Sequence, residues 1–298
     1  MNAIESKTQS PSFVFFGTPE FAVVVLDELK EHGLTPSLIV TAPDKKRGRK
    51  LLLTPQPVKI WAEKNNISIL QPEKLDSHFI QGLQHTTYDL FIVAAYGKII
   101  PKSILSLPRH GALNVHPSLL PAFRGASPIQ SAILYADITG TTIMLMDEVL
   151  DHGHIVAQET LDMPLPIKRL TLEKALAHLG GKLLAQIIPQ WIDGNLHAHE
   201  QKHAAATYTQ KIKKVDGLFE LEEIKTNPKE LYRKFCAYDG WPSLYFFIKK
   251  DDKNLRVIVK EASFENSAFV IKKVLPEGKT LMSWNEFQRM IISTKPVQ

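Results

Sequence analysis

Phe13-Val-Phe-Phe-Gly-Thr-Pro-Glu-Phe-Ala22 combines a buried strand, a tight turn and the start of a helix. The apolar run before Gly17 is typical of a strand covered on both faces. Thr18 can cap a helix that opens with Pro19 and Glu20. Further strands are expected at 38–41, 67–70, 88–95, 112–115 and 141–146, and helices at 58–65, 127–135 and 171–188. This alternation predicts an α/β fold built on a doubly wound, mostly parallel sheet.

A polar pair stands in the segment Ala112-Leu-Asn-Val-His-Pro117. Side chains two residues apart in a strand face the same way, so Asn114 and His116 should lie side by side. Pro117 cannot donate to a sheet ladder, so the strand should end there with both groups at its tip. With Asp151 downstream, the set suits acyl-type transfer, in which an oxyanion develops and a proton moves. From these residues alone, a capped strand end and an ordinary turn at Asp151 remain open.

The carboxyl ends of several predicted strands carry the residues of interest. Ligands of doubly wound sheets bind beyond those ends. Gly17, Gly97 and the tip at His116 all lie there, so they can share one cleft. The first turn holds one glycine instead of Gly-x-Gly-x-x-Gly, which argues against a dinucleotide site.

Length and composition indicate a soluble protein of 298 residues, long enough for two domains. The first twelve residues lack the apolar core of an export signal, and no apolar run approaches the length of a membrane span. The single cysteine, Cys236, excludes an internal disulfide and favours a reducing compartment. We therefore expect a cytoplasmic protein without a membrane partner.

The last third of the chain differs from the rest in net charge and in its pattern of apolar and polar residues. Residues 207–298 hold 17 Lys and Arg against 12 Asp and Glu, whereas residues 1–206 hold 19 of each. The excess suggests a polyanionic partner, although a solvated basic surface also explains it. Residues 195–209 show no clear periodicity of apolar residues, which indicates a linker. Short apolar runs at 218–221, 244–248, 255–259 and 268–272, with a helix near 228–238, predict a small antiparallel β unit of barrel type.

Several segments together resemble the methionyl-tRNA formyltransferases, over almost the whole chain. They are Phe16-Gly-Thr-Pro-Glu-Phe-Ala22, Ala94-Ala-Tyr-Gly-Lys98, Leu113-Asn-Val-His-Pro-Ser-Leu-Leu-Pro121, Arg124-Gly-Ala-Ser-Pro-Ile-Gln130, Leu150-Asp151 and Ala206-Thr-Tyr208. The motif around Asn114 and His116 is specific for the wider folate-dependent formyltransferase group. The motif at Arg124 and the basic last third point to the members that act on tRNA.

The resemblance implies a Rossmann-like formyltransferase domain over 1–194, a linker over 195–209, and an OB-like, tRNA-binding barrel over 210–298. It implies transfer of the formyl group of 10-formyltetrahydrofolate to the α-amine of methionyl-initiator tRNA, giving N-formylmethionyl-tRNA for translation initiation. The co-substrate would be the folate, with no metal, and we expect a monomer.

Catalytic roles are implied for three residues. Asn114 should hydrogen-bond the formyl oxygen, His116 should assist proton transfer, and Asp151 should orient His116 or accept the proton of the amine through water. Contacts to folate are implied for Ser118, Leu119, Leu120, Pro121, Tyr96, Gly97 and Asp147.

The basic segment Lys45-Lys-Arg-Gly-Arg-Lys50 has five cations in six positions. The charge run alone favours a solvated loop. The resemblance implies that it contacts the acceptor end of tRNA, through Lys45, Lys46, Arg47, Arg49 and Lys50, with Arg49 the most important because a guanidinium can fork onto phosphate or stack on a base.

Three positions depart from the family pattern, namely Phe123, Val149 and His152. Rival functions are a sugar-nucleotide N-formyltransferase, a glycinamide ribonucleotide formyltransferase, a formyltetrahydrofolate hydrolase and a non-catalytic RNA-binding protein. The basic segments argue against the first three, and the intact catalytic set argues against the last. A zinc site of His116, His152 and His154 is disfavoured, because neither Cys nor carboxylate stands at ligand spacing.

Overall fold

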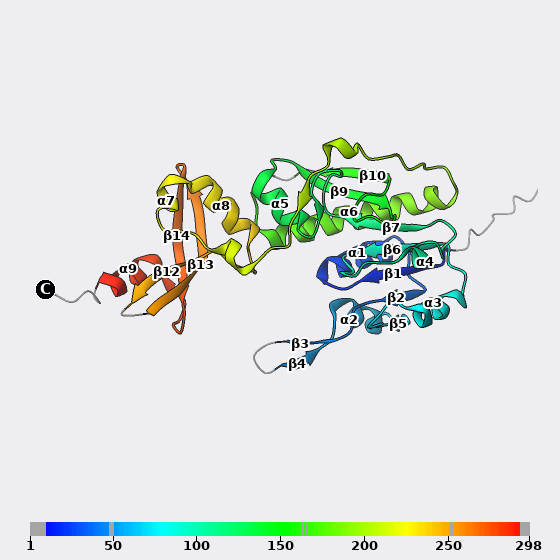
Figure 1. Ribbon diagram of the computed structural model, residues 1–298, viewed down its shortest axis with the longest axis horizontal. Helices are drawn as coiled ribbons and strands as arrows, with labels where there is room; N and C mark the ends of the chain where they lie inside the picture. The colour runs from blue at the N-terminus through cyan, green and yellow to red at the C-terminus, as the bar shows by residue number, and fades with distance from the viewer. Residues whose placement is uncertain (1–9, 48–50, 163, 165, 251–252, 293–298) are drawn as a thin grey trace, which may run out of the picture. The chain divides into compact units, whose positions relative to one another are not determined.

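The computed structural model describes residues 10–47, 51–162, 164, 166–250 and 253–292 (Figure 1). The chain divides into two compact units. The first, here called the α/β unit, comprises residues 1–124, 140–161 and 174–208, and the second, the β unit, comprises 125–139, 162–173 and 209–298. Within the described ranges no helix is both long and apolar enough to span a bilayer.

A seven-stranded sheet forms the centre of the α/β unit in the described part of the chain, in the order β10-β9-β7-β6-β1-β2-β5. Neighbouring strands from β7 to β5 are parallel, whereas β9 is antiparallel to β7. The prediction of a mostly parallel sheet is therefore confirmed. The strands are β1 (Phe13–Gly17), β2 (Leu38–Val40), β5 (Ile69–Leu70), β6 (Leu90–Ala94), β7 (Ala112–His116), β9 (Thr139–Leu145) and β10 (Ile155–Leu161).

Helices cover both faces of this sheet. Phe16 of β1 belongs to a buried cluster with Phe79 of α3 and Ile104 of α4. Helix α6 approaches the sheet at Gly180, where an added Cβ would lie 2.5 Å from Val115 Cγ1, so only glycine allows this approach. The next residue, Gly181, faces Glu28 of α1. The helices are α1 (Glu20–Glu31), α2 (Pro57–Lys64), α3 (Ser77–Gln84), α4 (Lys102–Leu105) and α6 (Arg169–Ile192).

The turn after β1 differs in one respect from the prediction. Helix α1 begins after Pro19, with no side chain bonded to its first amides. Thr18 does not cap this helix, because its hydroxyl instead donates to the carbonyl of Tyr96 at 3.2 Å. The segments that follow the neighbouring strands β1 and β6 are thus joined at the carboxyl ends of these strands.

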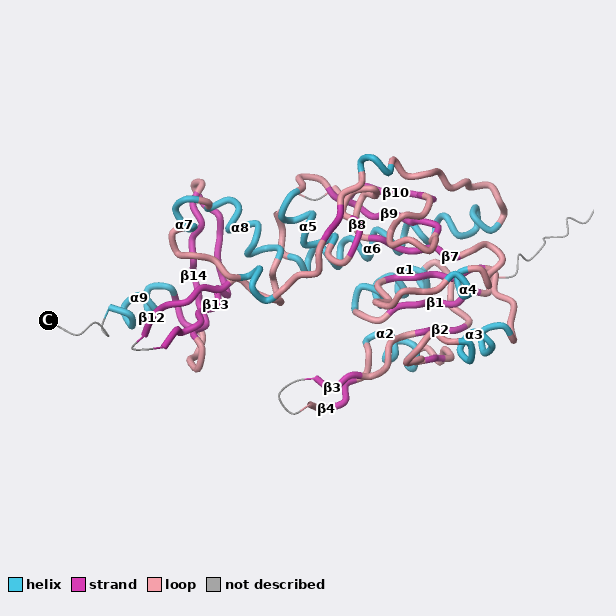
Figure 2. The backbone as a smooth tube through the Cα atoms, viewed as in Figure 1, coloured by secondary structure: helices cyan, strands magenta, loops and turns pink. Residues whose placement is uncertain are grey.

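A hairpin stands where the sequence indicated a loop. Strands β3 (Lys45–Arg47) and β4 (Leu52–Thr54) pair antiparallel, and Figure 2 shows them extending away from the central sheet. Leu52 and Leu53 are about two-thirds exposed, at 65% and 67%. Among the side chains of these strands that the structure describes, none is buried, so alternation of apolar and polar residues could not reveal the strands. A second short pair is formed by β8 (Arg124–Gly125) and β11 (Tyr208–Thr209).

The β unit contains an antiparallel sheet in the order β12-β13-β14-β15. Phe246 lies in its core against Phe219, Trp284 and Phe287, with ring centroids 5.3 to 6.1 Å apart. Residues 218–221 are not a strand as predicted, because only Leu218 forms an isolated bridge to Tyr245. The elements are α5 (Pro128–Tyr135), α7 (Glu223–Thr226), α8 (Pro228–Ala237), β12 (Tyr245–Lys250), β13 (Lys253–Glu265), β14 (Ala268–Pro276), β15 (Met282–Ser283) and α9 (Trp284–Ile292), with short 3-10 turns at His203–Ala205 and Lys214–Gly217.

Candidate active site

The candidate site lies at the carboxyl end of β7. The strand ends at His116, directly before Pro117, as the sequence predicted. Asn114 is half-buried, opposite Val93 of β6 and Met144 of β9, and His116 is only 4% exposed. Because β1, β6 and β7 are parallel neighbours, their carboxyl ends meet at one edge of the sheet. The expected grouping of these strand ends is confirmed.

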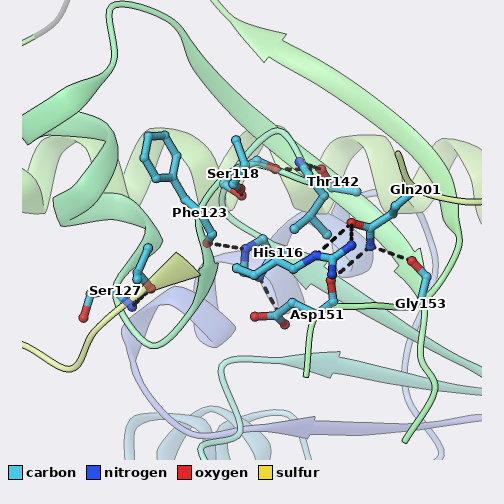
Figure 3. Close-up of polar contacts among 12 residues, drawn as sticks. His116, Ser118, Phe123, Ser127, Thr142, Asp151, Gly153 and Gln201 are labelled. Atoms are coloured by element: carbon cyan, nitrogen blue, oxygen red, sulfur yellow. Dashed lines mark hydrogen bonds and ion pairs between the residues drawn. The ribbon is translucent and has the colours of Figure 1, made fainter. Parts of the chain in front are cut away.

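The imidazole of His116 lies between two oxygen atoms. Figure 3 shows the ring between Phe123 and Asp151: Nδ1 is 3.5 Å from Asp151 Oδ1, and Nε2 is 3.3 Å from the Phe123 carbonyl oxygen. Burial lowers the pKa of His116 from its ordinary value of 6.5, and the charge of Arg124 acts in the same direction. The Asp151 carboxylate and the Phe123 carbonyl oppose this shift without reversing it. The ring is therefore neutral at neutral pH and can accept a proton.

Asp151 comes from the loop between β9 and β10 and is 8% exposed. Its backbone has φ of +51°, in the left-handed region that non-glycine residues rarely adopt. The Gln201 side-chain amide donates to the carbonyls of Asp151, at 3.0 Å, and Gly153, at 2.6 Å. This loop conformation brings the carboxylate to His116 from 35 residues further along the sequence. Spacing alone could not predict that contact.

The segment predicted to contact folate forms the loop after β7. Ser118 and Leu120 are buried, and the Ser118 hydroxyl donates to the Ala122 carbonyl at 2.6 Å. The Thr142 hydroxyl donates to the Ser118 carbonyl at 2.6 Å and accepts from the Leu120 amide at 3.0 Å. The peptide bond before Pro121 is cis. The side chains of Ser118 and Leu120 thus face the protein interior, whereas Leu119 and Pro121 are half-buried.

The other predicted folate contacts lie in the loops after β6 and β9. Tyr96 is 3% exposed, and burial raises its pKa to about 12. Gly97 has φ of +81°, which favours glycine at this turn. Asp147 accepts from the Val149 amide at 2.9 Å and lies 2.6 Å from His152 Nδ1. The Asp147 carboxylate is therefore engaged within its own loop.

The predicted tRNA contacts fall in the β3–β4 hairpin. Lys45 and Lys46 are exposed, and Arg47 closes strand β3. Arg49 and Lys50 lie outside the described residues. At the base of the hairpin, Asp44 pairs with Lys59 at 2.7 Å. The hydrogen bond from Gln71 and the pairing with Lys59 lower the pKa of Asp44.

Phe123 and His152, two of the positions that differ from the family pattern, contact residues of the site. The Phe123 carbonyl contacts His116, from a residue with φ of +60°. His152 stacks on His203 with ring centroids 4.2 Å apart, next to its contact with Asp147. Val149 is 58% exposed. The sequence did not single out the carbonyl of Phe123, because a backbone acceptor has no residue signature.

A buried arginine is the most unexpected feature near the site. Arg124 is 2% exposed, and its guanidinium donates to Gln201 Oε1, with Nη2 at 2.6 Å and Nε at 3.2 Å. Nη2 also lies 2.9 Å from His203 Nδ1. Gln201 and His203 belong to the segment predicted as a linker, whose polar composition hid their burial. In the sequence, their role could be inferred only through Arg124, because an arginine that is buried requires hydrogen-bond partners.

Within the described ranges, no three His, Cys, Asp or Glu side chains are grouped so that they could hold a metal ion. His116 faces Asp151, and His152 faces Asp147 and His203.

Known proteins resemble this chain at both the sequence and the structural level. Residues 12–188 match the formyl transferase family model. A methionyl-tRNA formyltransferase of Halalkalibacterium halodurans is 41% identical over 296 residues, covering 93% of each chain. That of Chloroflexus aggregans is 40% identical over 237 residues, covering 78% of this chain and 75% of its own.

Solved structures share the fold at lower identity. A methionyl-tRNA formyltransferase from Clostridium thermocellum superposes with a TM-score of 0.57 at 16% identity, covering 92% of this chain and 99% of that one. The family match spans more than half of the chain, and the H. halodurans relative matches it nearly end to end. This chain therefore belongs to the formyl transferase family, among the methionyl-tRNA formyltransferases.

Proposed function

We propose that this chain transfers the formyl group of 10-formyltetrahydrofolate to the α-amine of methionyl-initiator tRNA. The observation that carries the proposal is the tip of β7, where a buried imidazole lies 3.5 Å from a carboxylate and two residues from a carboxamide. Membership of the family supports the choice of acceptor.

Asn114 is the proposed donor to the formyl oxygen. Its side chain shares a face of β7 with His116 and is half-buried, so it can meet a ligand at the strand end. The formyl oxygen gains negative charge as the amine attacks. One well-placed donor stabilises such an oxygen by about 3 kcal/mol in the transition state.

His116 is the proposed proton acceptor. An α-amino group titrates at about 7.7 to 8.0, so it carries a proton in part of the population at neutral pH. A neutral imidazole with a lowered pKa takes up that proton as the amine nitrogen forms its bond to the formyl carbon. When the bond between the formyl carbon and N10 of the folate breaks, the imidazolium can return the proton to N10. Asp151 orients Nδ1 and stabilises the charged ring, so the enzyme itself needs no nucleophile.

Folate is proposed to bind along the carboxyl edge of the sheet. Bound there, it would supply the formyl group. Ile99, Val149 and Leu150 expose 87%, 58% and 67% of their side chains beside the ends of β6 and β9. Exposed apolar side chains at the ends of parallel strands fit a flat ring system that is partly apolar. We propose that residues 96–99, 147–150 and 118–121 border this ligand, mainly through their backbone.

The tRNA is proposed to contact two parts of the chain. The exposed cations of the hairpin, with Arg49 and Lys50, would meet the acceptor end, and residues 210–298 would form an OB-like tRNA-binding domain after a catalytic domain over 1–194 and a linker over 195–209. The net excess of positive charge after residue 206 supports this second contact. We propose that the protein acts in the cytoplasm as a monomer.

Radiolabelled formyl transfer tests the proposal. The purified protein is supplied with labelled 10-formyltetrahydrofolate and offered methionyl-initiator tRNA, methionyl-elongator tRNA, free methionine, an amino-sugar nucleotide or water. We expect label on the methionine of initiator tRNA at the highest kcat/KM. Preferred transfer to the sugar nucleotide or to water would refute the assigned acceptor, and absence of transfer to every acceptor would refute the activity.

A further inference from the structure

The carboxamide of Gln201 links the catalytic loop to a buried charge. Its oxygen accepts from Nη2 and Nε of Arg124 at 2.6 and 3.2 Å, and its nitrogen donates to the carbonyls of Asp151 and Gly153 at 3.0 and 2.6 Å (Figure 3). Gln201 is only 3% exposed. Both donor hydrogens and both acceptor positions of the amide are therefore engaged within the protein.

These four contacts require a glutamine in one orientation. A reversed amide would place its NH₂ group against the guanidinium and its oxygen against two carbonyl oxygens, which is repulsive on both sides. A glutamate would keep an acceptor for Arg124 but would have no donor for the two carbonyls. An apolar side chain of similar length would lose all four contacts.

The loop that Gln201 holds is conformationally unusual. Asp151 has φ of +51°, in a left-handed region that aspartate adopts more readily than most residues but less readily than glycine, so the surrounding contacts help to maintain it. On the far side of the turn, Gly153 is pressed against the Leu145 carbonyl, where an added Cβ would lie 1.9 Å from the oxygen. From this conformation Asp151 Oδ1 reaches to 3.5 Å from His116 Nδ1.

We propose that Gln201 is a positioning residue for formyl transfer: by tying the backbone of Asp151 and Gly153 to the buried guanidinium of Arg124, it keeps the Asp151 carboxylate beside Nδ1 of His116. The role rests on the proposed function, because Gln201 acts through His116. Arg124 is a suitable anchor, since it also contacts His203 at 2.9 Å and Tyr208 at 3.4 Å.

Two substitutions at Gln201 separate its contact with Arg124 from its contacts with Asp151 and Gly153. Gln201→Met removes all four hydrogen bonds at similar size, whereas Gln201→Glu removes only the donors to Asp151 and Gly153. We expect kcat to fall about 10- to 100-fold in both variants, because the carboxylate moves away from His116. The KM values for folate and tRNA should stay within about twofold, since Gln201 contacts neither ligand.

The titration of His116, followed by NMR of the imidazole, gives a readout that does not need activity. Loss of a nearby carboxylate lowers the pKa of a histidine, so Gln201→Met should shift the His116 titration to lower pH, as Asp151→Asn does. The matched control is Thr141→Val, which removes a fully buried hydroxyl that donates to the Leu176 carbonyl at 3.0 Å. It should lower Tm without changing kcat or the titration.

Several outcomes overturn the proposal. A Gln201→Glu variant with wild-type kcat would mean that anchoring Arg124 suffices, and an unshifted His116 titration in Gln201→Met would mean that Gln201 only stabilises the fold. If near-UV circular dichroism shows that Gln201→Met does not fold, Gln201→Asn is measured by the same criteria, because its shorter amide cannot span both partners. Failure of wild-type protein to formylate methionyl-tRNA would refute the proposed function alone, since the NMR titration still reports the position of Asp151.

Discussion

The tip of β7 and the β3–β4 hairpin belong to the same unit but differ in solvent exposure. The imidazole and the carboxylate of the first are buried, and the lysines of strand β3 in the second are exposed. His116 and Asp151 are 4% and 8% exposed, and each has protein partners that fix its position. Lys45 and Lys46 are exposed on a hairpin whose Leu52 and Leu53 also face solvent. In the proposed function the first region acts through geometry, which salt does not screen, and the second through charge, which salt does screen. Substitutions should therefore affect the two regions through different kinetic constants.

The largest effect is expected at the tip of β7. His116→Ala removes the proton acceptor and Asn114→Ala removes the donor to the formyl oxygen, so each should lower kcat by about 100- to 1000-fold. Both side chains lie away from the hairpin, and tRNA affinity should remain within about twofold. Single-turnover formylation and filter binding measure the two quantities. Turnover near the wild-type rate in either variant would remove that residue from the site.

A smaller loss is expected for Asp151→Asn, because the imidazole remains. The substitution removes the charge that opposes burial, so the pKa of His116 should fall further below 6.5. We expect kcat to decrease about 10- to 100-fold and the acidic limb of the kcat profile to move to lower pH. A limb that moved to higher pH would contradict the contact between Asp151 and His116.

The strand that carries the site was predictable because its local signals agree. Burial of β1, β6 and β7 shows as apolar runs, and Pro117 marks the end of β7, so the position of Asn114 and His116 followed from residue types. Strand β10 was missed, since only its first two residues are buried and its sequence lacks a clear pattern. The hairpin was missed for the same reason, because neither strand has a buried face.

The surroundings of His116 were only partly predictable. Asp151 was a candidate from its residue type, but an ordinary turn residue explained it equally well, and only the family resemblance implied that it supports His116. The Phe123 carbonyl has no residue signature, and Gln201 meets Arg124 across 77 residues of sequence. Such contacts depend on tertiary packing, which a single sequence does not reveal.

An intermediate effect is expected from the hairpin. The double substitution Lys45→Ala and Lys46→Ala should raise KM for tRNA several-fold while leaving kcat and KM for folate unchanged, because the proposed role of these exposed cations is to contact the RNA backbone. If both contact phosphates, the slope of log affinity against log salt should decrease by about 1.4 to 1.8. The matched control is the double substitution Lys30→Ala and Lys64→Ala, which removes two exposed lysines from helices α1 and α2. An unchanged salt slope would exclude the hairpin from tRNA binding.

The smallest effect concerns stability and follows from the burial of His116. Its pKa is lowered in the folded protein, so the unfolded chain takes up a proton near pH 6.5 while the folded protein does not. The contribution of this residue to the free energy of unfolding is therefore complete above pH 6.5 and is lost as pH falls toward the folded pKa. His116→Gln lacks this group, so its urea midpoint should change less than that of the wild type between about pH 7.5 and about pH 5.5.

His85→Gln replaces an exposed imidazole and serves as the control for that comparison. It shows how far the loss of one histidine alters the midpoint when the site itself is intact. A pH dependence of the His116→Gln midpoint equal to that of the wild type would contradict the burial of the His116 ring. His116 would then not be the buried, packed residue that distinguishes the tip of β7 from the exposed hairpin.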